Sequence, residues 1–156
     1  MIFISYRRKD SEDFVVRLQE HLESVFGKEL VFRDVGRLEG SQDWQAELDT
    51  ELGKSLVVLA VIGDRWELAR EERVGHPHHG LLRLSLDYDA VRRELELALP
   101  QSGEDPGQKK VIPLLINGTE MPSRERLAGL VNTSSRPDLD SIPLVKLATA
   151  GAFKLT

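Results

Sequence analysis

The sequence predicts a single α/β domain in which a five-stranded, mainly parallel sheet is flanked by helices on both faces. Three observations lead to this fold class. Short apolar, strand-like segments alternate along the chain with segments whose apolar residues recur at helical spacing. Residues 56–62 form one continuous apolar run, which is typical of a strand covered by helices on both sides. The length, 156 residues, is that of one domain with a buried core.

Five apolar segments are expected to form the strands. The first opens the chain as Ile-Phe-Ile-Ser, and the second is the short run Leu-Val-Phe. The third is the continuous apolar run, which we expect at the centre of the sheet. The fourth contains Pro113, which a strand tolerates only at an edge or a bulge. The strands are expected at residues 2–5, 30–32, 56–62, 111–116 and 142–147.

Four segments are expected to form helices because their apolar residues recur every three or four positions. Asp10 and Ser11 are candidate caps for the first helix and Ser41 for the second. Asp87 or Asp89 can cap the third. The helices are expected at residues 14–26, 42–54, 90–99 and 124–130, with long connections at residues 33–43 and 63–86.

Composition and charge exclude several classes of protein. The chain has no cysteine, which excludes a disulfide scaffold, a thiol nucleophile and a cysteine-ligated metal site. A net charge of −5 argues against binding to nucleic acid, because phosphates need a basic face. The longest apolar run has seven residues, far short of the ~20 that a membrane-spanning helix needs. We therefore expect a cytoplasmic domain that binds neither nucleic acid nor membranes directly.

Several common site motifs are missing from the sequence. It has no Gly-rich phosphate loop of either standard type and no Gly-x-Ser-x-Gly nucleophile elbow. The tract His76-Pro77-His78-His79 carries three imidazoles, but it has glycines on both sides and no carboxylate within the next few residues. We interpret this tract as a solvated loop, and we expect no metal site.

Ligands of parallel sheets bind beyond the carboxyl ends of the strands, where this sequence places several polar or aromatic residues. Tyr6 and Arg7 either bind phosphate through a stacking ring and an arginine fork or form an ordinary polar loop. Asp34 either binds a sugar hydroxyl or caps its loop. Trp44 and Trp66 are more often core or rim aromatics than ligand platforms. The candidates at the strand ends are Ser5, Tyr6, Arg7, Arg33, Asp34 and Trp66.

The third helix carries a further candidate, Glu94. On an ideal helix, Val91, Leu95 and Leu99 fall on one apolar stripe, and Glu94 falls at its margin. A carboxylate at that margin is partly desolvated and can face a cleft. Geometry alone favours the other interpretation, a surface glutamate in an ion pair with a nearby arginine.

Several segments, in this order, resemble bacterial Toll/interleukin-receptor (TIR) domains. Residues 3–11, Phe-Ile-Ser-Tyr-Arg-Arg-Lys-Asp-Ser, are similar to the family's first strand and the loop after it. Residues 31–34, Val-Phe-Arg-Asp, resemble its second strand. Residues 89–99 and 111–114 resemble its third helix and fourth strand. The resemblance covers about residues 1–130 and implies a flavodoxin-like TIR fold with a five-stranded parallel sheet.

The resemblance also implies an activity. Many similar bacterial domains hydrolyse NAD⁺ between nicotinamide and ribose, and others release cyclised ADP-ribose, with no further cofactor. The family's catalytic glutamate corresponds to Glu94, which reverses the interpretation from geometry alone. By the same analogy, Ser5, Tyr6, Arg7, Arg33, Asp34 and Trp66 bind the substrate. An aromatic residue often precedes the catalytic glutamate by four positions, where this chain has Ala90, with Tyr88 two residues earlier.

Two further expectations follow from the family, both concerning partners. Activity often depends on self-association of TIR domains, here through the 33–43 loop and the neighbouring helices, in antiviral or cell-suicide signalling. The domain is expected to span residues 1–147, with residues 148–156 as a tail or the start of a linker to a downstream sensor module. The alternatives are a non-enzymatic TIR–TIR interaction module and an enzyme that transfers or exchanges the base of another nucleoside.

Overall fold

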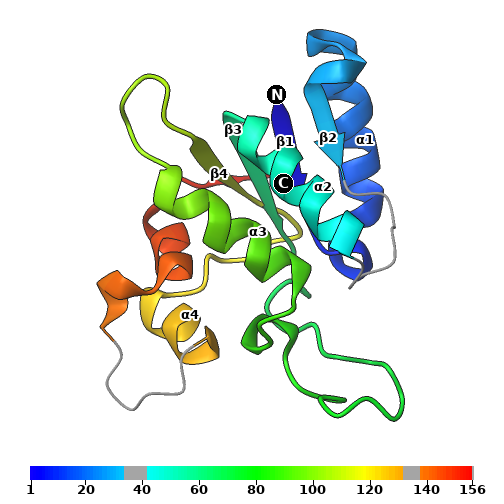
Figure 1. Cartoon of the computed structure of the whole chain (residues 1–156), viewed down its shortest axis with the longest axis vertical. Helices are drawn as coiled ribbons and strands as arrows, with labels where there is room; N and C mark the ends of the chain where they lie inside the picture. Colours follow the sequence, from blue (N-terminus) through cyan, green and yellow to red (C-terminus); the bar gives the residue numbers. More distant parts are fainter. Residues whose placement is uncertain (34–41, 132–137, 156) are drawn as a thin grey trace.

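A parallel sheet crosses the computed structural model, which describes residues 1–33, 42–131 and 138–155, with only the backbone of residues 42–44 (Figure 1). All neighbouring strands are parallel, in the order β2-β1-β3-β4-β5. The expected α/β fold is therefore confirmed. The strands are β1 (Ile2–Ser5), β2 (Val31–Arg33), β3 (Val57–Ile62), β4 (Lys110–Leu115) and β5 (Phe153–Lys154).

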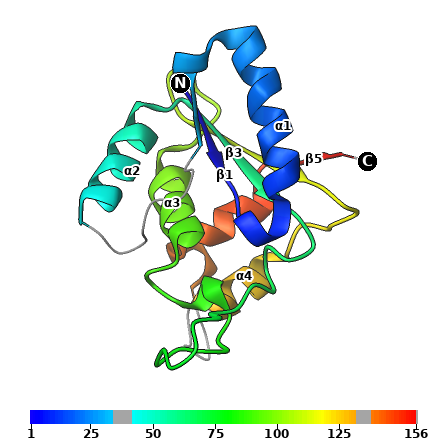
Figure 2. The ribbon, with the colours of Figure 1, turned by 90° about the vertical axis from the view of Figure 1, so that its right-hand side faces the viewer.

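Helices cover both faces of this sheet. Figure 2 shows α1 on one side, with α2 and α3 on the other. The α-helices are α1 (Arg8–Phe26), α2 (Gln42–Lys54), α3 (Ala90–Ala98) and α4 (Arg124–Val131). Short 3-10 helices join them: η1 (Lys28–Leu30), η2 (Arg83–Ser85), η3 (Leu99–Gln101), η4 (Leu139–Ser141) and η5 (Pro143–Thr149).

The side chains of β1 and β3 alternate between two separate cores. Phe3 and Val58 pack with Leu95 of α3 in the larger core, on what we call the α3 face. Ile4 and Val61 pack in the smaller core with α1, on what we call the α1 face. Residues adjacent along a strand therefore reach opposite sides of the sheet, which decides how the candidate residues group.

The fifth strand is not where the sequence predicted it. The segment expected to be a strand, residues 142–147, lies almost wholly in η5. Its buried residues Leu144, Val145 and Leu147 follow a helical rather than an alternating pattern, and Pro143 occupies the first helical position, where it needs no N–H partner. The actual strand β5 has two residues and pairs with Leu114 and Leu115, inside the segment expected to be a tail.

Pro113 lies within β4, between β3 and β5, and is accommodated by the register. Lys110 donates its N–H to Leu56 and Ile116 donates to Ile62, so the even-numbered residues of β4 bond to β3. Pro113 therefore faces the other side, and the pairing of β5 begins only at Leu114. No ladder hydrogen bond is lost to the missing N–H.

Helix α1 begins earlier than expected, at Arg8, and neither predicted residue is its N-cap. The N-cap position is Arg7, and Ser11 has non-helical backbone angles that kink the helix after its first turn. The carboxylate of Asp10 instead accepts hydrogen bonds from the backbone N–H groups of Gly63 and Arg65, at 2.8 and 2.7 Å. These bonds fix the start of α1 to the carboxyl end of β3.

Candidate functional site

Glu94 lies on the side of α3 that packs against the rest of the molecule. The other buried residues of this helix are Val91, Leu95 and Ala98, and Glu94 itself is only 6% exposed. Helix α3 contacts β1, whose carboxyl end carries several of the predicted site residues. Glu94 is thus not a surface residue, and its carboxyl group lies in a region where water screens charges weakly.

The position of Glu94 is set by the start of its helix. Of the two predicted candidates, Asp87 and Asp89, the N-cap is Asp89, and its Oδ2 accepts the N–H of Arg92 at 3.1 Å. Glu94 follows Asp89 by five residues, about one and a half helical turns. Contacts that hold the carboxylate of Asp89 therefore also fix the start of α3, the helix that carries Glu94.

Arg7 holds Asp89 from the end of β1. Its Nη1 and Nη2 donate to Oδ1 and Oδ2 of Asp89, both at 2.8 Å, in a two-pronged ion pair. Its Nε donates to the backbone carbonyl of Trp66 at 2.8 Å. The guanidinium is buried, and each of its three nitrogens has a protein partner. In this structure Arg7 joins β1, the 63–89 connection and α3.

Two buried polar atoms lie on the same face of the sheet as Glu94. Ser5 follows Phe3 by two residues in β1 and so shares its face, while Trp66 belongs to the larger core. Both residues are almost fully buried, yet Ser5 Oγ and Trp66 Nε1 have no hydrogen-bond partner among the described residues. Buried polar groups are rarely left unpaired, so these two atoms are candidates for contact with a ligand.

Tyr6 and Arg33 lie on the opposite face. Tyr6 is buried in the smaller core, and its hydroxyl accepts a hydrogen bond from Arg33 Nη1 at 3.1 Å. The guanidinium of Arg33 also lies 5.9 Å from the centre of the Tyr6 ring, and its Nε donates to Gln19 of α1. These contacts tie β1 and β2 to α1. The structure therefore brings Ser5, Arg7, Trp66 and α3 together and places Tyr6 and Arg33 apart from them.

Two of the predicted residues cannot be placed. Asp34, with most of the 33–43 loop expected to mediate self-association, lies outside the described residues. Trp44 belongs to the backbone of α2, but its side chain is also outside the description. Their roles stay predictions.

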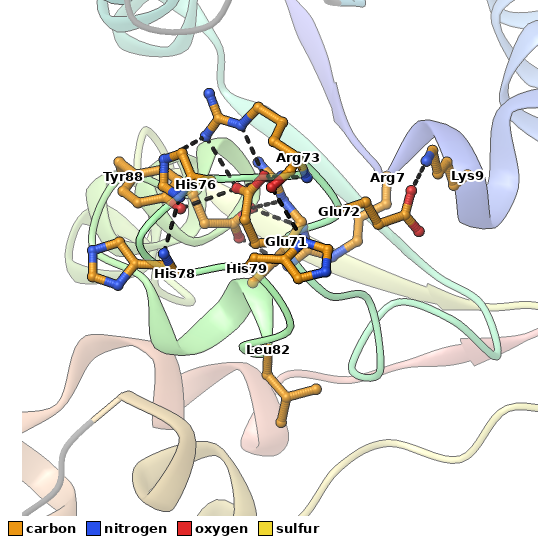
Figure 3. Close-up of polar contacts among 12 residues, drawn as sticks. Arg7, Lys9, Glu71, Glu72, Arg73, His76, His78, His79, Leu82 and Tyr88 are labelled. Carbon is orange, nitrogen blue, oxygen red and sulfur yellow. Dashed lines mark hydrogen bonds and ion pairs between the residues drawn. The ribbon is translucent and has the colours of Figure 1, made fainter.

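Tyr88, two residues before Ala90, packs against the histidine tract. The hydroxyl of Tyr88 donates to Glu71 Oε2 at 3.0 Å, and its ring packs against His76 and His78. It is therefore part of the 63–89 connection (Figure 3). Ala90 packs against the edge of the larger core.

Sequence reasoning missed two residues that organise this region, Glu71 and Arg83. Glu71 is buried and accepts hydrogen bonds from Arg73, Arg83 and Tyr88. The hydrogen bonds from Arg73 hold the pKa of the Glu71 carboxyl well below its usual range, against the opposing effect of burial. In the sequence, nothing distinguishes Glu71 from its exposed neighbour Glu72.

Asp10 shows the opposite electrostatic behaviour. Burial raises the pKa of its carboxyl above the usual 3.8, although the N–H groups of Arg65 and Gly63 work in the other direction. Its acceptor role was not evident from the sequence, where it was expected to cap a helix.

The histidine tract belongs to the same connection as Glu71. His76 Nδ1 accepts the N–H of His78 at 3.1 Å, and His78 and His79 are exposed. Over the described ranges, no three histidine or acidic side chains gather in a way that could hold a metal ion. Over the same ranges, no helix has the length and apolar character needed to cross a membrane.

The sequence model of the family described as TIR domain matches residues 2–142, which is most of the chain. No curated protein was found to match the chain in sequence.

Proposed function

Because the chain belongs to the TIR-domain family, as the match over residues 2–142 shows, we propose that it is a NAD⁺ glycohydrolase with Glu94 as its catalytic carboxylate. The observation that carries the proposal is the burial of Glu94 on the inner side of a capped helix. This burial does not fit the alternative interpretation, in which Glu94 is an exposed glutamate paired with an arginine at the surface.

The reaction suits a single buried carboxylate. The bond between the ribose C1′ and the nicotinamide nitrogen breaks, and its electron pair leaves with nicotinamide, which departs neutral. The sugar becomes an oxocarbenium-like cation, to which water adds with loss of a proton, giving ADP-ribose. A negative charge held nearby, where water is scarce, stabilises the cation more than it stabilises the substrate.

The orphaned polar atoms on the α3 face support a polar ligand at this site. Ser5 Oγ can donate or accept a hydrogen bond, and Trp66 Nε1 can donate one. Hydroxyls and phosphate oxygens of a dinucleotide supply matching groups. A substrate role for Tyr6, Arg33 or Asp34 remains a prediction, and the first two are reached only from the α1 face.

The proposal includes the setting expected from the family. We propose that self-association activates the domain, in bacterial immune or cell-suicide signalling in the cytoplasm, with a sensor module elsewhere in the full-length protein. A TIR domain that only assembles with others is the competing function, and nicotinamide release by clustered protein separates the two.

The test measures nicotinamide release from NAD⁺ by liquid chromatography, over a wide range of protein concentration and with the domain clustered on beads. We expect cleavage to rise with clustering and to fall at least ~10²-fold in Glu94→Gln, which keeps the shape but removes the charge. Glu96→Gln is the matched control, because Glu96 lies on the same helix, is 36% exposed and pairs with Arg92.

Loss of cleavage in Glu94→Gln alone supports the hydrolase. Wild-type protein that self-associates but releases no nicotinamide even when clustered contradicts it and favours the interaction module.

A further inference from the structure

A chain of alternating charges runs from the end of β1 through the 63–89 connection. Arg7 forms the ion pair with Asp89, and Asp89 Oδ1 also accepts a hydrogen bond from Arg83 Nε at 3.2 Å. Arg83 Nη1 in turn lies 3.4 Å from Glu71 Oε2. Arg73 closes the chain, with its Nε 2.8 Å from Glu71 Oε1. Asp89 thus pairs with two arginines, and so does Glu71. Arg83 contacts both carboxylates and links the two groups.

Glu71 is the inner anchor of this chain. Its side chain is only 1% exposed, although it lies in a connection whose neighbouring residues are exposed. Its carboxylate accepts two hydrogen bonds from the side chain of Arg73, one from its backbone N–H at 3.1 Å and one from Tyr88. Figure 3 shows Arg73, His76 and Tyr88 gathered around Glu71.

The backbone around Glu71 is fixed as well. Glu71 donates its N–H to Leu81, and its carbonyl accepts from Gly80, both at 2.9 Å. Arg83 donates its N–H to Ala69 at 2.8 Å. These bonds fold the connection back on itself, so that Glu71 and Arg83 face one another from its two arms. The hydrogen-bonded backbone therefore brings the side chains of Glu71 and Arg83 close together.

We propose that Glu71 is a positioning residue for Glu94. It holds Arg83 in place, Arg83 holds the N-cap Asp89 together with Arg7, and Asp89 sets where α3 begins. Its role in catalysis rests on the proposed NAD⁺ cleavage, whereas the mechanical coupling to α3 does not. Among the described residues, Glu71 reaches Asp89 through Arg83, which contacts both carboxylates, and Tyr88, which precedes Asp89 in the chain, also donates to Glu71. We assign the main path to Arg83.

The competing interpretation is that Glu71 only holds its own loop together. Glu72 provides the matched control, since it is adjacent in sequence, 62% exposed and paired with Lys9 of α1 rather than with the charge chain. Glu71→Gln and Glu72→Gln remove the same charge from neighbouring positions, and only the first interrupts the chain.

The first measurement is hydrogen–deuterium exchange of the full domain, which needs no enzymatic activity. In Glu71→Gln we expect about tenfold faster exchange at the amides of α3 as well as within the connection, and in Glu72→Gln no change in α3. Faster exchange confined to residues 69–83, with α3 as in the wild type, would overturn the proposal.

The second measurement is the kinetics of NAD⁺ cleavage by clustered protein. A displaced Glu94 should lower kcat about tenfold in Glu71→Gln and leave KM within about twofold, because positioning affects the reacting centre more than substrate affinity. If Glu71→Gln lowers the rate only because less of the protein is folded, kcat per folded molecule is unchanged. That result contradicts a positioning role. If the wild type cleaves no NAD⁺, the proposed function fails, and the exchange measurement still decides the coupling.

Two more variants test the path and guard against misfolding of Glu71→Gln. In an Arg83→Gln background, Glu71→Gln should add little to the exchange of α3, because the link is already broken. A full additional effect would show that Arg83 does not carry the coupling. Tyr88→Phe removes a single hydrogen bond to Glu71 and should change α3 exchange in the same direction by a smaller factor; no change in α3 counts against the proposal.

Discussion

The two faces of the sheet each carry a carboxylate anchor, and the two anchors bind different kinds of partner. On the α3 face, side-chain ion pairs connect distant segments, above all Arg7 with Asp89. On the α1 face, a carboxylate binds backbone N–H groups, as Asp10 does at Gly63 and Arg65. The pKa values shift in opposite directions. Hydrogen bonds from Arg73 lower the pKa of the Glu71 carboxyl, whereas burial raises the pKa of the Asp10 carboxyl.

This difference concerns how precisely each anchor fixes the orientation of the segment that it holds. A two-pronged arginine–carboxylate pair fixes direction as well as distance, and its strength depends on both partners being present. A carboxylate on main-chain donors anchors a loop irrespective of the side chains in that loop. The face that carries Glu94 is the one held by oriented ion pairs.

The largest effect on stability is expected from Asp89→Asn. The substitution keeps an acceptor for the cap but leaves the guanidinium of Arg7, only 6% exposed, without its counter-charge. Removing one partner of a buried ion pair costs about 3–5 kcal/mol of unfolding free energy. Urea unfolding measures the loss, with the exposed Asp87→Asn as control. Equal stability of the two variants would show that the α3 face does not depend on this pair.

A smaller loss is expected from Gly63→Ala, which tests the α1 face. A Cβ at this position would lie 2.6 Å from Asp10 Oδ1, so the carboxylate would have to leave the two N–H groups that it now accepts from. Freeing these donors should cost about 1–2 kcal/mol in thermal or urea unfolding.

Gly129→Ala is the control for that measurement. Gly129 lies in α4, where a Cβ meets nothing within 4 Å, so the substitution should be neutral or stabilising by up to about 1 kcal/mol. The same sign of change in both glycine variants would contradict the role given to Asp10.

The smallest effect is expected from Tyr6→Phe. The ring stays buried, and the loss of the hydroxyl that accepts from Arg33 should cost about 1 kcal/mol or less. NAD⁺ cleavage should stay within about twofold of the wild type, because the α1 face lies across the sheet from Glu94. A KM for NAD⁺ raised tenfold would contradict this expectation and support the substrate role predicted for Tyr6.

Most of the fold followed from the sequence because apolar pattern and burial coincide in it. The runs that became β1, β3 and β4 are continuous and short, as strands buried on both faces are. The two-residue β5 has no pattern to detect, and the apolar residues before it belong to a 3-10 helix. A strand defined mainly by the edge it pairs with is decided by tertiary structure.

The candidate site was predicted in part. Glu94 was singled out by resemblance, and Ser5 and Trp66 lie on its face of the sheet. The position at the carboxyl end of the first strand and the resemblance both group Tyr6 with Ser5, although successive side chains along an extended chain point to opposite faces. Glu71 could not have been found from the sequence. It is buried because the 63–89 connection folds back on itself, and no sequence pattern in that connection predicts this.

The register of β3 with β4 has a consequence for folding kinetics. Val57 pairs with Lys110, so the two strands at the centre of the sheet meet only when residues about fifty positions apart come together, and such non-local pairing slows folding. The connection between them already closes on itself through the bonds between its two arms around Glu71. Formed before β4 docks, that local closure would shorten the stretch of chain that remains to be ordered.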